Sequence, residues 1–198
     1  MMLAVTVLTV LMFGQAAAKT VTATEIVKQI EAGKGVDYEN TTVTGDFDLS
    51  NLPNRMNDAT YPENGKTARV YSAKITAPIS FKNVVFRGKL DFFRKEAGEK
   101  EIKEFRLIFA KAVKFENCTF NETADFELTN FDGGISFESS VFKAKPSFIR
   151  IGLEKTPNFT KTIFENGSIF KNFQSDSEQN LTAEKLENFY RNYLESIQ

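Results

Sequence analysis

The chain has 198 residues and a mass of 22.3 kDa, which is enough for one domain. Its 25 basic and 26 acidic residues leave a formal net charge of −1, which excludes a strongly basic nucleic-acid-binding protein and a disordered polyelectrolyte. It contains no histidine and no tryptophan, but 20 phenylalanines. The lack of histidine excludes histidine-based catalytic triads, metal sites and proton switches.

The chain starts with an uncharged apolar run at residues 3–13, followed by Ala16-Ala17-Ala18. At about 1.5 Å per residue, the run is too short to cross about 30 Å of hydrocarbon. Ala16 and Ala18 give the small-x-small pattern of a signal-peptidase site, although Met1-Met2 adds no positive charge. We therefore predict a secretory signal peptide over residues 1–18, with Lys19 as the first mature residue in the periplasm or the medium. An uncleaved anchor and a buried helix are the alternatives.

Residues 19–42 are predicted to form a short helix and a lead-in. Thr24 can serve as the N-cap, residues 26, 27 and 30 are apolar, and Gly33 can end the helix. One face of this helix is expected to cover the start of the repeat region that follows, because the first strand of a stacked sheet would otherwise expose its backbone.

A phenylalanine repeat dominates residues 43–175. Phenylalanines recur every eleven residues in one series from 115 to 170, and a second series from 120 to 164 has the same spacing with Leu153 in one slot. The two series interleave at alternating steps of five and six residues. The residue two positions before each centre is small, β-branched or proline, as at Cys118, and most of the others are polar. Three residues of strand alternation followed by a turn predict short strands that stack on one another with their rings inside.

The predicted core of this region consists of the apolar residues at these centres, which are Phe81, Phe86, Phe92, Phe115, Phe120, Phe126, Phe131, Phe137, Phe142, Phe148, Leu153, Phe159, Phe164 and Phe170.

These units resemble the pentapeptide-repeat family, whose consensus is A(D/N)(L/F)xx. The matching units include ADFEL, ISFES, SVFKA and TIFEN within residues 113–172, with weaker matches at 79–93 (ISFKN) and 45–54 (GDFDL). The resemblance implies an all-β solenoid, a right-handed four-sided β-helix with four units, or about 22 residues, per coil. The chain departs from the consensus by the sixth residue in alternate units and by Pro146 and Pro157 at the small-residue slot.

Two segments interrupt the repeat, at residues 54–78 and 94–104. The first is polar and lacks phenylalanine, and the second is a charge run (RKEAGEKEIKE) that indicates a solvated loop or a short helix. Because insertions in repeat proteins map to loops, these two segments are the best candidates for a specific contact.

Residues 176–198 are predicted to form a C-terminal capping helix. Its apolar residues follow helical spacing and must be buried, either against the last coil or in a dimer contact. The candidate cap or dimer residues are Leu186, Phe189, Tyr190 and Tyr193. The resemblance adds that some family members pair through their C-terminal ends.

Charge is unevenly distributed along the repeat. Residues 113–140 are mainly acidic and residues 141–174 mainly basic. Ordinary solvated faces and a docking surface for a charged partner or for head-to-tail association are both consistent with this pattern.

The sequence contains no constellation that points to catalysis. Asp125 and Glu127 flank Phe126, but paired carboxylates need a pocket that shifts their pKa values, and an outward-facing solenoid wall does not provide one. Cys118 is the only cysteine, which excludes an intrachain disulfide and favours a small buried core residue over a reactive thiol. We expect no catalytic residues, no cofactor and no metal.

The sequence therefore predicts an exported, non-catalytic β-solenoid that acts as a structural scaffold or protein-interaction module. Its expected partners are a protein and, through the C-terminal helix, a second copy, with no nucleic acid and no stable membrane span after signal cleavage. Two alternatives remain. The resemblance implies a DNA-mimicking inhibitor of a DNA-binding protein such as gyrase, if the protein is cytoplasmic; the other is an enzyme with a site in the insertions.

Overall fold

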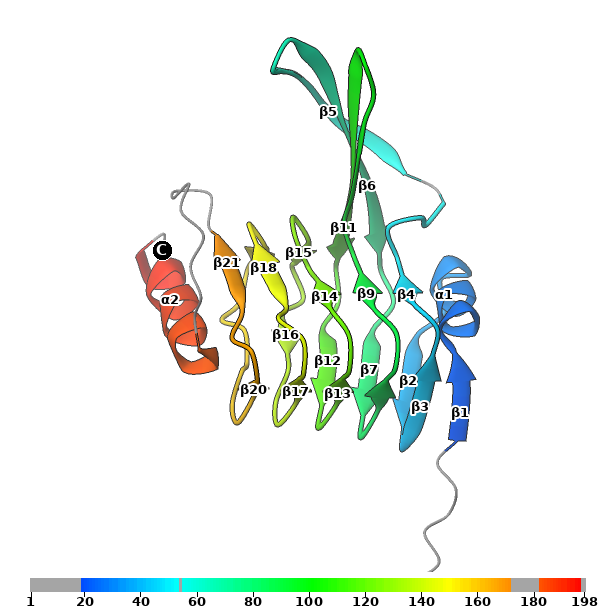
Figure 1. Ribbon diagram of the computed structural model, residues 1–198, viewed down its shortest axis with the longest axis vertical. Helices are drawn as coiled ribbons and strands as arrows, with labels where there is room; N and C mark the ends of the chain where they lie inside the picture. Colours follow the sequence, from blue (N-terminus) through cyan, green and yellow to red (C-terminus); the bar gives the residue numbers. More distant parts are fainter. Residues whose placement is uncertain (1–18, 54, 172–181, 197–198) are drawn as a thin grey trace, which may run out of the picture.

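The computed structural model describes residues 19–53, 55–171 and 182–196. Most of them lie in short β-strands, and one helix stands at each end of the stack (Figure 1). The predicted signal peptide, residues 1–18, lies outside the described residues. Within the described residues, no helix combines the length and apolar character that crossing a membrane requires.

The strands form four sheets whose members come from successive stretches of chain. Sheet A holds β1 (Lys19–Thr22), β3 (Thr41–Thr44), β8 (Val85–Phe86), β13 (Thr119–Phe120), β17 (Val141–Phe142) and β20 (Ile163–Phe164). Sheet B holds β2 (Val36–Glu39), β7 (Ile79–Lys82), β12 (Val113–Glu116) and β16 (Ile135–Ser136). Sheet C holds β4 (Phe47–Asp48), β9 (Leu90–Asp91), β14 (Ala124–Asp125), β18 (Ser147–Ile149) and β21 (Ile169–Lys171). Sheet D holds β5 (Met56–Glu63), β6 (Lys66–Ile75), β10 (Arg94–Ala97), β11 (Glu101–Phe109), β15 (Asn130–Phe131) and β19 (Gly152–Leu153).

From β2 onward the chain enters sheets B, A, C and D in turn and then returns to sheet B, and we call one such pass a rung. All pairings between rungs are parallel. Val113 pairs with Ile135 and Thr119 with Val141, so these later rungs repeat every 22 residues. The parallel stacks and the two helices agree with the prediction of an all-β fold with helical ends.

The stack begins earlier than residue 43, where the sequence placed its start. β1, β2 and β3 already pair with later strands of sheets A and B. The first helix, α1 (Ala23–Glu31), is capped by Thr22 rather than Thr24, because Thr22 and Glu25 form a capping box in which each side chain accepts a hydrogen bond from the other's backbone N–H. Its residues Ala23, Ile26 and Ile30 are buried.

The phenylalanines of the repeat lie inside the stack. Of the fourteen predicted core residues, twelve are buried, and Leu153 and Phe164 are partly buried against the same core. Many rings from successive rungs stack face to face, although Phe92–Phe126 and Phe142–Phe164 meet edge to face. From Phe81 through Phe115 and Phe137 to Phe159, neighbouring centroids are 5.4, 5.3 and 5.5 Å apart.

Two buried rings differ from the expected positions. Phe47, expected at the centre of the unit GDFDL, pairs with Leu90, so it fills the small-residue slot and Leu49 takes the centre. Phe109 was not predicted as a centre, yet it is 1% exposed and its ring stacks on Phe131. Phe109 lies eleven residues before Phe120, so the spacing alone could have identified it.

The turns explain why steps of five and six residues alternate. Each five-residue step from sheet B to sheet A passes through one residue with positive φ, at Asn40, Asn83, Asn117, Ser139 and Lys161. A left-handed residue turns the chain sharply, and asparagine tolerates this conformation better than most residues. The amides of Asn83 and Asn117 each donate a hydrogen bond to the asparagine of the preceding rung, which adds a polar ladder at this corner.

Candidate interaction surface

Both predicted insertions form β-hairpins that project from the stack (Figure 1). β5 pairs with β6, β10 pairs with β11, and the inner strands β6 and β11 pair in parallel from Thr67–Glu101 to Ile75–Phe109. We call β5, β10, residues 66–72 and residues 101–106 the flap. The expectation of a loop or short helix at 94–104 was wrong. One hairpin alone is marginally stable in water, but four adjacent strands can share buried side chains.

One side of the flap has a small core of its own. Ala68, Val70 and Ile102 are at most 6% exposed, and Glu104 is buried beside them. Lys95 Nζ lies 2.9 Å from a carboxylate oxygen of Glu63 and 3.3 Å from one of Glu104. Arg106 also donates to Glu104. This ion network joins β5, β10 and β11.

The network shifts the pKa values of its members. Burial opposes ionisation of Glu104, but the hydrogen bonds and charges of Arg106 and Lys95 outweigh it, so its pKa lies below the ordinary value. The hydrogen bond to Glu63 raises the pKa of Lys95. Both groups are therefore charged at neutral pH, and the network holds the two hairpins together.

The opposite side of the flap combines rings with guanidinium groups. Tyr71 and Phe105 stack with centroids 5.6 Å apart, and the guanidinium carbons of Arg94 and Arg55 lie 4.3 and 5.0 Å from the Phe105 centroid. Arg69 forms a 2.6 Å ion pair with Glu101. Two guanidinium nitrogens, Arg55 Nη1 and Arg94 Nε, are buried and make no hydrogen bond within the described residues. This side therefore presents cationic and aromatic groups in a fixed arrangement.

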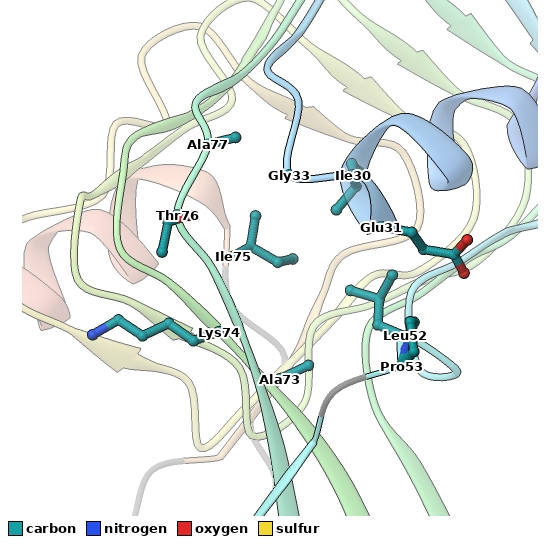
Figure 2. Close-up of a pocket in the computed structure, with 10 residues that line it drawn as sticks. All are labelled: Ile30, Glu31, Gly33, Leu52, Pro53, Ala73, Lys74, Ile75, Thr76 and Ala77. Atoms are coloured by element: carbon teal, nitrogen blue, oxygen red, sulfur yellow. The ribbon is translucent and has the colours of Figure 1, made fainter.

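A small cavity of about 120 Å³ lies where residues 73–77, at the end of β6 and just after it, meet α1 and the turn at Leu52–Pro53 (Figure 2). Ile30, Leu52 and Ile75 line it, while the charged end of Lys74 points away. Small-molecule sites commonly enclose about 300–1,000 Å³. This cavity is much smaller, so it is best explained as an imperfectly filled junction between α1 and the end of β6.

The candidate carboxylate pair lies on the outer side of sheet C. Burial raises the pKa of Asp125 and of Glu127, and the Asp125 charge adds to the rise at Glu127. Asp125 Oδ1 accepts a hydrogen bond from the Glu127 N–H at 2.9 Å, which fixes the side chain locally. Asp125 also pairs in register with Asp91, and Asp91 with Asp48. Among the described residues, no group of three or more cysteine or acidic side chains is arranged to hold a metal ion.

The C-terminal helix, α2 (Ala183–Ser196), covers the last rungs of its own chain. Leu186 and Tyr190 are buried. The centroid of the Phe170 ring lies 4.7 Å from the Phe189 centroid and 5.7 Å from the Tyr190 centroid. The Phe159 N–H donates to the Glu187 carboxylate at 3.0 Å, so the helix also satisfies an open strand edge. These contacts agree with a cap. The side chain of Tyr193 lies outside the described residues, and pairing through this helix stays a prediction.

No protein-family model, no curated protein and no solved structure matches the chain. The interpretation of the flap therefore depends on its own geometry and charges.

Proposed function

We propose that the chain is a right-handed four-sided β-solenoid of the pentapeptide-repeat kind. The fixed order of the four sheets, the 22-residue register and the stacked phenylalanine columns support this fold. An experimental structure tests it. Left-handed winding, or rings spread between two facing sheets, would overturn the proposal.

We further propose that the protein is an exported, non-catalytic scaffold that binds a protein partner through the flap. The observation that carries this proposal is the flap's own buried core and ion network, with Glu104 at its centre. Fixing a residue's backbone costs about 1–2 kcal/mol of conformational entropy, so a merely connecting segment would be shorter or less ordered. An ordered projection is suited to present a surface.

The chemistry of this surface suits a protein partner. Met56 and Tyr61, on the side of the flap with the small core, are 62% and 37% exposed, and the side chains of Arg69 and Lys103, on the opposite side, are 43% and 42% exposed. Methionine, tyrosine and arginine are enriched at protein interfaces. Lys103 and Arg69 both lie next to Glu101, so the exposed cations are held in place.

The test is affinity capture from the extracytoplasmic fraction with tagged protein. We expect the wild type to retain a partner that the flap variant Arg69→Glu/Lys103→Glu loses. Lys114→Glu, an exposed charge reversal on sheet B, is the matched control and should retain it. Equal capture by the flap variant and the control would contradict a role for the flap. Circular dichroism establishes that all three proteins are folded.

The proposed export has a separate test. Cleavage after Ala18 would leave β1, which starts at Lys19 and pairs with β3, intact. We expect cell fractionation to place the protein outside the cytoplasm and N-terminal sequencing of that protein to begin at Lys19. Recovery from the cytoplasm with Met1 retained would overturn the export proposal.

A further inference from the structure

Sheet A carries an uninterrupted row of β-branched side chains on its outer side. In each strand, the residue directly before the buried centre points outward, and neighbouring members of the row pair in register. The row consists of Thr20, Thr42, Val85, Thr119, Val141 and Ile163. Ile163, at the end of this row, is 54% exposed. Figure 1 shows β1, β3, β13, β17 and β20 in this order along one side of the stack.

Exposed charges of alternating sign flank this row. Arg87, Lys143 and Glu165 directly follow β8, β17 and β20, whereas Glu122 lies one residue further along, after Asn121, beyond the end of β13. Successive rungs therefore carry positive, negative, positive and negative groups, with the negative group of the β13 rung displaced by one residue. None of these four side chains forms an ion pair with another described residue, although Lys143 and Glu165 flank the neighbouring strands β17 and β20. These four charges, which form no ion pair among the described residues, are available to an external partner.

We propose that sheet A is the interface between two copies of this chain, packed face to face with their stacks antiparallel. The two-fold axis runs along the strands, midway between β13 and β17. This operation places Thr119 opposite Val141 of the second copy and Val85 opposite Ile163 of the second copy. The β-branched row thus packs against itself and covers the exposed Ile163.

The same operation matches the charges. Arg87 comes to lie opposite Glu165 of the second copy, and the rung of Glu122 opposite the rung of Lys143 of the second copy. Each contact occurs twice, because a two-fold interface presents the same patch from both subunits. In the second copy the rungs run in the opposite order, so the charges there read negative, positive, negative, positive. Each charge therefore faces one of opposite sign. A parallel arrangement of the two stacks would instead place like charges together.

The interface is small, so the dimer is expected to be weak. Strands lie about 4.8 Å apart, and four of them form a patch well below the roughly 800 Å² per partner of a standard interface. Association should therefore depend on protein concentration and weaken in high salt. Sheet D carries the flap, and sheets A and D are never consecutive in the rung order B, A, C, D. The proposed dimer is therefore independent of partner binding by the flap.

Disulfide cross-linking tests the geometry. In one chain, β8 and β20 are separated by β13 and β17, so residues 85 and 163 are about 14 Å apart and beyond the roughly 7 Å limit for a disulfide. We expect the double variant Val85→Cys/Ile163→Cys to form a covalent dimer on mild oxidation. Neither single variant should form one, because the two-fold axis brings neither position 85 nor position 163 near the same position of the second copy. Wild type controls for Cys118, which is buried.

Sedimentation equilibrium tests the energetics without new cysteines. We expect Arg87→Glu and Glu165→Lys each to weaken dimerisation about tenfold, because two ion pairs are lost and like charges are brought together. Arg87→Glu/Glu165→Arg should restore it, Val141→Arg should abolish it, and Lys114→Glu on sheet B should change nothing. A monomer at all concentrations, or a dimer indifferent to Val141→Arg, would overturn the proposal. Circular dichroism confirms folding of each variant.

Discussion

Phe137 stacks almost parallel on Phe115 of the preceding rung, with 3° between the ring planes and 5.3 Å between the centroids. It also stacks on Phe159 of the next rung, with 11° between the ring planes and 5.5 Å between the centroids, and it is 0% exposed. Phe137→Ala should therefore lower the free energy of unfolding by roughly 3–5 kcal/mol, and Phe137→Leu by less, because leucine refills part of the cavity. Urea titration measures both. An unchanged midpoint for Phe137→Ala would contradict the stacked register.

Gly88 permits two rungs to approach each other closely. A Cβ atom at this position would lie 2.3 Å from the carbonyl oxygen of Gly45, a backbone atom that cannot move aside alone. We expect Gly88→Ala to cost about 1–3 kcal/mol of stability in a thermal or urea unfolding experiment. Gly35→Ala is the matched control, because its nearest neighbour would be Pro78 at 3.6 Å, an ordinary contact. Equal stability of the two variants would show that the corner can relax.

The later rungs could be predicted because their register repeats at a constant interval. From Phe115 onward every rung spans 22 residues, so rings that stack in space also recur evenly in the sequence. The first rung lacks this signal. Its centres are Tyr38, Val43 and Leu49, and the hairpins stretch the interval between paired strands, as between Val36 and Ile79.

The flap could not be predicted from local pattern. β10 contains three charged residues out of four, and the most buried charged residue of β11 is Glu104. Glu104 can be buried because it forms ion pairs with Lys95 and Arg106. The pairing of β10 with β11 places Lys95 beside it, and composition alone does not reveal that pairing. The outward row of sheet A was equally hidden, because threonine, valine and isoleucine alternate there at long and unequal spacing, and only the register aligns them.

Ser139 offers a way to extend the asparagine ladder. It has φ of 56° and follows Asn117 at the corner between sheets B and A. Ser139→Asn should stabilise the protein by about 0.5–1 kcal/mol, because asparagine favours the left-handed conformation and its amide can donate to Asn117. Ser136→Asn, in the extended strand β16, is the control for which we expect no gain. Thermal unfolding compares them, and a destabilised Ser139→Asn would argue against the ladder.

Cys118 should be chemically inert in the folded protein. It is 1% exposed, its thiol donates to the Phe81 carbonyl oxygen at 3.4 Å, and burial raises its pKa to about 12. The thiolate is the reactive species, so we expect no labelling by a thiol reagent at pH 8 in the native state and complete labelling in denaturant. Rapid native labelling would show that this part of the stack opens. Ser140 and Thr162 donate to Phe115 and Phe137 in the same way, so Cys118→Ser should fold normally.

Asp125 should make stability depend on pH in the opposite sense to a salt-bridged carboxylate. Burial raises the pKa of Asp125 in the folded chain above the ordinary 3.8 of the unfolded chain. At pH values between 3.8 and the raised pKa, the folded chain therefore binds more protons than the unfolded chain. Stability therefore falls as the pH rises through this window, and at pH 7 the ionised group is a net cost. We expect Asp125→Asn to unfold at a higher temperature than wild type at pH 7, because asparagine keeps the acceptor for the Glu127 N–H without the charge.

The advantage of Asp125→Asn should shrink as the pH falls through the raised pKa and vanish below 3.8, where the wild-type carboxyl is neutral in both states. Melting temperatures of both proteins across this range measure it, with Asp37→Asn, at an exposed position of sheet B, as the control. A gain that persists undiminished in acid would mean that the substitution acts through packing. A loss at pH 7 would mean that hydrogen bonds to the carboxylate outweigh the cost of its burial.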